Sequence, residues 1–138
     1  MKNLIFILVA VIFSSCSSYD YKITSLEFKK LNFDELPLEV KEYLSNPPDP
    51  IGDSYKMLVL IDLTDSVNYS LETVETCIGP WVNYQKLIDK QKKVSYRINR
   101  GVPDPYIVFK NKLYIPDRYN IISVESARKA IYTEYQLK

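Results

Sequence analysis

The chain has 138 residues, with 18 lysines and arginines against 17 aspartates and glutamates, and it contains no histidine. The absence of histidine removes the commonest general base, the histidine-dependent catalytic triads and most zinc and copper sites. The glycines, Gly52, Gly79 and Gly101, lie too far apart for a glycine-rich phosphate loop. This composition favours a protein that is not an enzyme and needs no cofactor and no metal.

The first 16 residues have the order of a secretory signal. Lys2 precedes an uninterrupted apolar run over residues 4–13, and two serines then lead to Cys16. This run is too short to cross a membrane, which takes about 20 apolar residues. The stretch Phe13-Ser14-Ser15-Cys16 resembles a bacterial lipobox, the signal at which a lipid is attached to the cysteine sulfur and the chain is cut before that cysteine.

This resemblance implies a domain plan and a location. Residues 1–15 are expected to be a lipoprotein signal peptide, residues 16–20 a lipidated tether and residues 21–138 a single domain. Acyl chains on Cys16 would hold the protein in a lipid bilayer of the bacterial cell envelope. In lipoproteins of this kind, a serine directly after the cysteine implies sorting to the outer membrane, so Ser17 favours that membrane, in contact with the periplasm. The alternatives are an ordinary cleaved signal and a buried first strand.

The first half of the expected domain contains strand and helix patterns. Alternating residues predict a strand over 21–28, and an apolar stripe predicts a helix over 34–44 with Asp34 as its N-cap. A nearly continuous apolar run predicts a central strand over 56–63, buried on both faces. Within residues 64–80 we expect a short helix after a Ser70 cap, because Leu71, Val74 and Ile78 recur at helical spacing, although β-branched residues are frequent.

The second half is predicted to be mainly β. Strands are expected over residues 81–88, 94–98, 106–109, 113–116 and 131–137. The clearest signal is a hairpin in which the turn contains Asn111, a residue that tolerates left-handed backbone. Ser123 is predicted to cap a short helix that reaches Ala130. The expected fold is α+β, a single small domain with an antiparallel or mixed sheet of about six strands and two or three short helices.

Charge is unevenly distributed along the chain. Residues 20–85 contain 5 basic and 12 acidic side chains, whereas residues 86–138 contain 12 basic and 5 acidic ones. Two interpretations follow from this asymmetry. Elements from the two halves pair so that their exposed charges interleave, or the molecule has an acidic and a basic face that steers a charged partner.

Residues 86–100 are the most basic segment and are interspersed with apolar and aromatic residues. An exported protein rarely meets nucleic acid, so we expect no nucleic-acid partner and interpret the segment as a surface for a protein partner. The alternatives are a solvated hairpin whose lysines protect a sheet edge, and a patch for an anionic lipid headgroup or a polysaccharide. The predicted partner-binding residues are Trp81, Tyr84, Lys90, Lys92, Lys93, Tyr96 and Arg97.

The predicted function is that of a membrane-anchored lipoprotein that acts as a binding or accessory module, for example an inhibitor or immunity-type partner protein. The alternative is a carboxylate-dependent envelope hydrolase that acts on cell-wall or capsule glycan. This alternative requires a concave cleft with two carboxylates about 5 to 10 Å apart. Glu35, Glu39 and Glu42 are carboxylate candidates, but their position opposite the apolar stripe of the predicted helix favours a solvated face.

Overall fold

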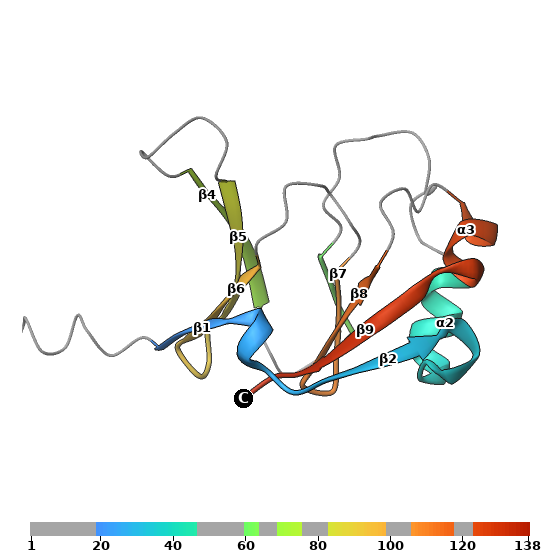
Figure 1. Cartoon of the computed structure of the whole chain (residues 1–138), viewed down its shortest axis with the longest axis horizontal. Coiled ribbons are helices and arrows are strands. Elements are labelled where there is room, and N and C mark those ends of the chain that lie inside the picture. Colours follow the sequence, from blue (N-terminus) through green and yellow to red (C-terminus); the bar gives the residue numbers. More distant parts are fainter. Residues whose placement is uncertain (1–18, 47–59, 64–68, 76–82, 99–105, 118–122) are drawn as a thin grey trace, which may run out of the picture.

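The computed structural model describes residues 19–46, 60–63, 69–75, 83–98, 106–117 and 123–138, and these form three layers (Figure 1). A four-stranded sheet packs on one face of a five-stranded sheet, and two short α-helices pack on its other face. The α+β class is thereby confirmed in its general form. The prediction of one sheet is wrong, because strands that are close in sequence divide between two sheets.

The smaller sheet has the strand order β1-β6-β5-β4. Its strands are β1 (Tyr19–Lys22), β6 (Val94–Ile98), β5 (Asn83–Asp89) and β4 (Tyr69–Glu75). The β1 strand runs parallel to β6, and the other neighbours are antiparallel. The first strand of the described chain, β1, therefore pairs with β6, which lies more than seventy positions later in the sequence.

The larger sheet has the order β2-β9-β8-β7-β3. Its strands are β2 (Phe28–Asn32), β9 (Ile131–Gln136), β8 (Lys112–Pro116), β7 (Tyr106–Phe109) and β3 (Leu60–Asp62). Only β3 and β7 are parallel among the described pairs of this sheet. Because β3 lies at one end of the sheet, the prediction of a central strand over 56–63 is wrong for the described residues 60–62, and residues 56–59 lie outside the described part.

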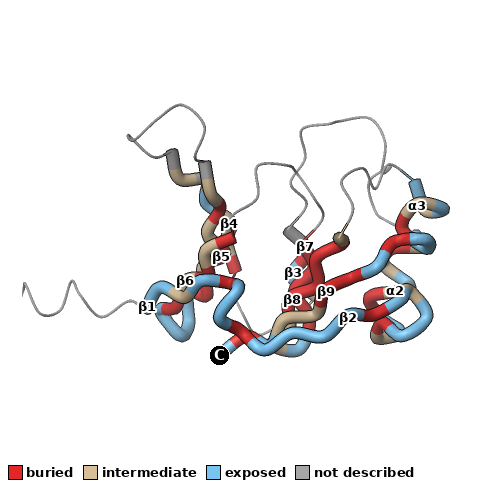
Figure 2. Tube along the Cα trace, viewed as in Figure 1, coloured by how far each residue is buried: buried red, intermediate tan, exposed pale blue. Residues whose placement is uncertain are grey.

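The larger sheet is the middle layer, and its covered faces explain its sequence. All four residues of β7 are buried, as are the last four of β8 (Figure 2). Strands covered on both faces read as continuous apolar runs, which is what this hairpin shows. Its turn has Lys110 and Asn111 in the left-handed region, with φ of 46° and 61°. The predicted hairpin is confirmed.

The predicted helix after Ser70 is wrong for residues 71–75, which belong to β4 (Tyr69–Glu75). Each residue of β4 pairs with β5 in an antiparallel register that runs from Tyr69 opposite Asp89 to Glu75 opposite Asn83. In a strand, Leu71 and Val74 point to opposite faces, so their helical spacing does not create one apolar face. The β-branched residues of this segment were the better guide, because they suit a pleated sheet.

The predicted strand over 21–28 is divided. A 3-10 turn, η1 (Ile23–Ser25), separates β1 from β2 and takes the chain from the smaller sheet to the larger one. The apolar side chains of Ile23 and Leu26 are buried between the sheets. Tyr19 and Asp20, which were expected in the tether, begin β1.

The first helical region also begins differently from the prediction. A 3-10 turn, η2 (Phe33–Glu35), precedes α2 (Leu38–Ser45), so Asp34 is not the N-cap of the α-helix. Instead, the Asn32 backbone N–H donates to Glu35 Oε2 at 2.8 Å and closes a capping box around η2. The expected apolar stripe is nevertheless buried, with Val40 and Leu44 against the larger sheet.

The second helix is α3 (Val124–Lys129), and its predicted cap is confirmed. The Ser126 backbone N–H donates to Ser123 Oγ at 3.1 Å. Ala127 is buried against the larger sheet, and its carbonyl accepts a hydrogen bond of 2.7 Å from the Tyr132 hydroxyl. This bond joins α3 to the start of β9 across the short connection between them.

Candidate functional site

The structure separates the predicted partner-binding residues into different places. Lys90, Lys92 and Lys93 are exposed in the turn between β5 and β6, whereas Tyr84 and Arg97 lie on the outer face of the smaller sheet. Trp81 and the predicted lipidation site Cys16 lie outside the described residues. The predicted set is therefore not one continuous surface.

Tyr96 belongs to the core between the sheets. Its exposed fraction is 0%, and its ring stacks with that of Tyr21 at 6.1 Å between centroids. Its hydroxyl donates to the Lys138 carbonyl at 2.9 Å and accepts from the Lys138 backbone N–H at 3.0 Å. Burial raises the pKa of Tyr96. This side chain holds the last residue against the smaller sheet, so we omit it from the binding surface.

The outer face of the smaller sheet carries a compact charged cluster. Arg97 Nη2 donates to Asp20 Oδ2 at 2.7 Å, and its guanidinium lies 4.6 Å from the centroid of the Tyr84 ring. Lys86 Nζ is 3.6 Å from the same carboxylate oxygen. Burial alone would raise the pKa of Asp20, but the hydrogen bonds from Arg97 and Ser95 and the Lys86 charge outweigh it and lower that pKa. These opposite charges largely satisfy one another.

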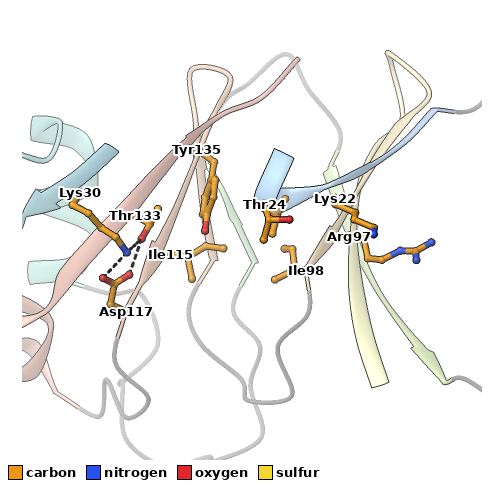
Figure 3. A pocket seen from close by; sticks show the side chains of 10 residues that line it. Lys22, Thr24, Lys30, Arg97, Ile98, Ile115, Asp117, Thr133 and Tyr135 are labelled. Atoms are coloured by element: carbon orange, nitrogen blue, oxygen red, sulfur yellow. Dashed lines mark hydrogen bonds and ion pairs between the residues drawn. The ribbon is translucent and has the colours of Figure 1, made fainter. Parts of the chain in front are cut away.

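A pocket of about 190 Å³ opens between the two sheets (Figure 3). Ile98 of the smaller sheet and Ile115 of the larger sheet form apolar walls, and η1 contributes Ile23 and Thr24. The Arg97 side chain also lines the pocket, but Figure 3 shows its guanidinium turned away from Asp117. Six of the ten lining residues are polar or charged, so the pocket is mainly polar, with a smaller apolar part at Ile98 and Ile115.

Three polar side chains form one end of this pocket. Lys30 Nζ is 2.7 Å from Asp117 Oδ2 and 2.6 Å from Thr133 Oγ1, and Thr133 Oγ1 donates to Asp117 Oδ1 at 2.6 Å. These residues come from β2, from the position directly after β8, and from β9. The closed set of contacts fixes the Asp117 carboxylate between a cation and a hydroxyl. Asp117 is the single carboxylate among the described lining residues, so this pocket does not supply the pair that the glycan-hydrolase alternative requires.

An exposed aromatic side chain stands beside the pocket. Phe28 is 62% exposed and lies directly opposite Tyr135, which lines the pocket. Their ring centroids are 6.2 Å apart. Phe28 begins β2, which pairs with β9 on one side and with no described strand on the other. Apolar area, a pocket and an unpaired strand edge thus meet at one place.

Sequence reasoning missed these pocket residues. Lys30 and Asp117 are 87 positions apart, and Thr133 is 103 positions from Lys30, so no local pattern relates them. The one available signal was that each of these two charges is the minority charge of its half. Lys30 is basic in the mainly acidic half, and Asp117 is acidic in the mainly basic half. That signal would have nominated many other residues as well.

The described residues show no further centre for chemistry. Among them, no group of three or more cysteine and acidic side chains is placed to hold a metal ion. Over the same part of the chain, no helix has the length and apolar character needed to cross a membrane. No protein-family model, no curated protein and no solved structure matches this chain.

Proposed function

We propose that the protein is a lipid-anchored protein of the bacterial envelope whose folded domain binds another protein and has no catalytic role. The lipobox-like stretch that ends at Cys16 supports the anchor. The observation that carries the binding role is the pocket beside Phe28, at the edge of β2 that no described strand pairs with. A single exposed apolar residue is common on protein surfaces, but an aromatic residue beside a pocket and an unpaired strand is typical of a recognition surface.

The partner that fits this surface is an extended segment of another envelope protein. Such a segment adds a strand to a sheet edge through backbone hydrogen bonds, and side-chain pockets then provide specificity. An apolar cavity of about 150 Å³ holds a benzene molecule, so a pocket of about 190 Å³ is large enough for one apolar side chain. Ile98 and Ile115 would contact that side chain, and Phe28 would cover it from the solvent side.

Site-specific photo-cross-linking in intact envelopes tests the binding surface. A photoreactive residue in place of Phe28 is expected to give one defined protein adduct, identified by mass spectrometry. The control is the same residue in place of Leu38, which is 63% exposed and lies on α2, away from the pocket lining. Equal adducts at both positions would show non-specific contact and contradict the proposal.

A blocking substitution tests the pocket itself. Thr24 is exposed and lines the pocket, so Thr24→Trp places a large ring at its mouth without changing the buried core. The adduct at position 28 is expected to disappear in this variant while the thermal melting temperature stays close to that of the parent protein. An undiminished adduct in a folded Thr24→Trp protein would mean that the partner does not enter the pocket.

The anchor has its own test. Cys16→Ala removes the thiol that would carry the lipid, so the domain is expected to leave the membrane fraction. Mass spectrometry of the parent protein is expected to show an acylated N-terminal cysteine. An unmodified methionine terminus, or Cys16→Ala protein that remains with membranes after alkaline washing, would contradict the lipid anchor.

A further inference from the structure

We propose that the protein stands on its membrane with one particular end down, and that lysines at this end bind the anionic headgroups around the anchor. The lysine end consists of the exposed residues Lys90, Lys92, Lys93, Lys110 and Lys138. They come from the β5–β6 turn, the β7–β8 turn and the last residue of the chain. This inference rests on the proposed lipid anchor at Cys16 and adds an orientation and a lipid class to it.

Direct contacts bring these three segments together. Lys92 Nζ donates to Asn111 Oδ1 at 2.7 Å and to the Lys138 carbonyl at 3.1 Å. Asn111 Nδ2 donates to the Leu137 carbonyl at 2.9 Å, and the Leu137 backbone N–H donates to the Asn111 carbonyl at 3.0 Å. Figure 1 shows both turns and the C-terminus at the same end of the two sheets. The lysines are therefore presented together by a connected backbone.

The start of β1 lies at this same end. The Tyr19 backbone N–H donates to the Lys93 carbonyl at 3.3 Å, and Tyr19 pairs with Val94 at the beginning of β6. Cys16 precedes Tyr19 by three positions, and three fully extended residues span at most about 10 Å. A lipid on Cys16 thus keeps the start of β1 within about 10 Å of the membrane surface, a distance comparable to the Debye length of about 8 Å at physiological salt.

Local charge favours an anionic surface. The acidic residue of the turn, Asp89, has an exposed fraction of 0% and is occupied by backbone N–H groups of the turn. No described acidic side chain pairs with Lys90 or Lys93. Two exposed acids lie close to this end: Asp20 directly follows Tyr19 and pairs with Arg97 and Lys86, and the Glu27 carbonyl accepts a hydrogen bond from the Gln136 backbone N–H. The five ammonium groups outnumber the carboxylates of Glu27 and Asp89 and the terminal carboxylate of Lys138, which leaves a net positive charge at this end.

This orientation places the polar end of the pocket away from the membrane. Lys93 precedes β6, whereas Arg97 and Ile98 of the pocket are at the other end of that strand. In the same way, Asn111 precedes β8 and Asp117 follows it. Lys30, Asp117 and Thr133 therefore lie toward the end of the strands that faces away from the membrane, and a partner could reach this part of the pocket from the aqueous side. Phe28 lies nearer the lysine end, because its neighbour Tyr135 pairs with Leu113, two positions after Asn111.

The test is lysine footprinting of the lipidated full chain on vesicles. The protein is placed on vesicles of phosphatidylcholine alone or of phosphatidylcholine with phosphatidylglycerol, and an amine-reactive reagent reports the accessibility of each lysine by mass spectrometry. Each lysine near an anionic surface shifts the contact equilibrium about fivefold. Lys90, Lys93 and Lys110 are expected to be protected severalfold on the anionic vesicles, and high salt should reverse this protection. Lys29 and Lys129 should react equally on both.

A matched pair of charge reversals provides the control. Lys90→Glu, Lys93→Glu and Lys110→Glu together should abolish the protection of Lys138, which remains at the lysine end. Replacing Lys29, Lys41 and Arg128 by glutamate makes the same change in net charge, at residues on β2 and the helices. This control variant should keep the protection of Lys138. Circular dichroism melts confirm that both variants are folded.

The outcomes separate this inference from the anchor. Protein that floats with both kinds of vesicle but shows equal protection of the lysine end on neutral and anionic lipid would overturn the orientation and leave the anchor intact. Protein that floats with neither, and carries no lipid by mass spectrometry, would overturn the anchor and with it the orientation. Loss of Lys138 protection in both charge-reversal variants would show that binding depends on net charge alone. That result would also overturn the proposed orientation.

Discussion

Asp89 provides a sharp test of how the β5–β6 turn is held. Its Oδ1 atom accepts hydrogen bonds of 3.0 Å from the backbone N–H groups of Gln91 and Lys92, and the side chain is fully buried. Hydrogen bonds to a charged acceptor contribute about 1.5–3 kcal/mol each, and a deleted partner leaves the donors unsatisfied. One opposing effect is the desolvation of the carboxylate, because Oδ2 has no partner among the described residues. We expect Asp89→Ala to lower the free energy of unfolding by about 2–4 kcal/mol, since two donors lose their acceptor.

The assay is thermal unfolding followed by circular dichroism. A domain of this size loses about 4 °C of melting temperature per kcal/mol, so Asp89→Ala should melt about 10 °C below the parent protein. Asp89→Asn is the matched control, because it keeps an oxygen acceptor and removes the buried charge, and it should melt between the two. A melting temperature of Asp89→Ala equal to that of the parent, or below it only as far as Asp89→Asn, would refute the assignment of Oδ1 as the organiser of the turn.

Three further stability changes follow from other contacts. Tyr132→Phe removes the buried hydrogen bond to the Ala127 carbonyl and should cost about 1–3 kcal/mol in urea unfolding; an unchanged midpoint would contradict that bond. Leu44→Ala empties a site that is 1% exposed under the larger sheet and should cost about 2–5 kcal/mol; a cost below that of an exposed Leu→Ala change would contradict its burial. Asp20→Asn should cost up to about 1 kcal/mol at pH 7, because the Arg97 pair is partly solvated. Since folding lowers the pKa of Asp20, this contribution is present above about pH 4 and disappears as the pH falls through the folded-state pKa; a difference from the parent that grows on acidification would contradict it.

The parts of the fold that could be predicted are those whose determinants lie close together in the sequence. The hairpin around Asn111 combines two apolar runs with a residue that tolerates positive φ, and the α3 cap places a serine oxygen three residues before the N–H that it accepts. In both cases the partner groups are neighbours. Local chemistry alone is sufficient to specify such an element.

The division into two sheets depended on pairings that a local pattern does not contain. Tyr21 is aligned with Tyr96 in β1 and β6, yet β2, only a few residues after β1, pairs with β9. The chain changes sheet at η1, where nothing but the burial of Ile23 and Leu26 distinguishes the crossing from a continuous strand. The pocket shares this limitation, because its polar end joins Lys30 to Asp117.

The structure shows the interleaving that the opposite charges of the two halves predicted, whereas a basic face that steers a charged partner stays a prediction. Asp20 of the acidic half pairs with Arg97 and Lys86 of the basic half, which is the expected interleaving. The pairing does not consume the cations of the two turns, because the acid closest to them in sequence, Asp89, faces inward and accepts from the backbone. A count along the chain cannot distinguish these two uses of charge, since a carboxylate contributes equally to the count whether it is buried or exposed. The positive excess therefore gathers at the end of the molecule where β1 begins, and its position beside the predicted anchor is a property of the fold rather than of the composition.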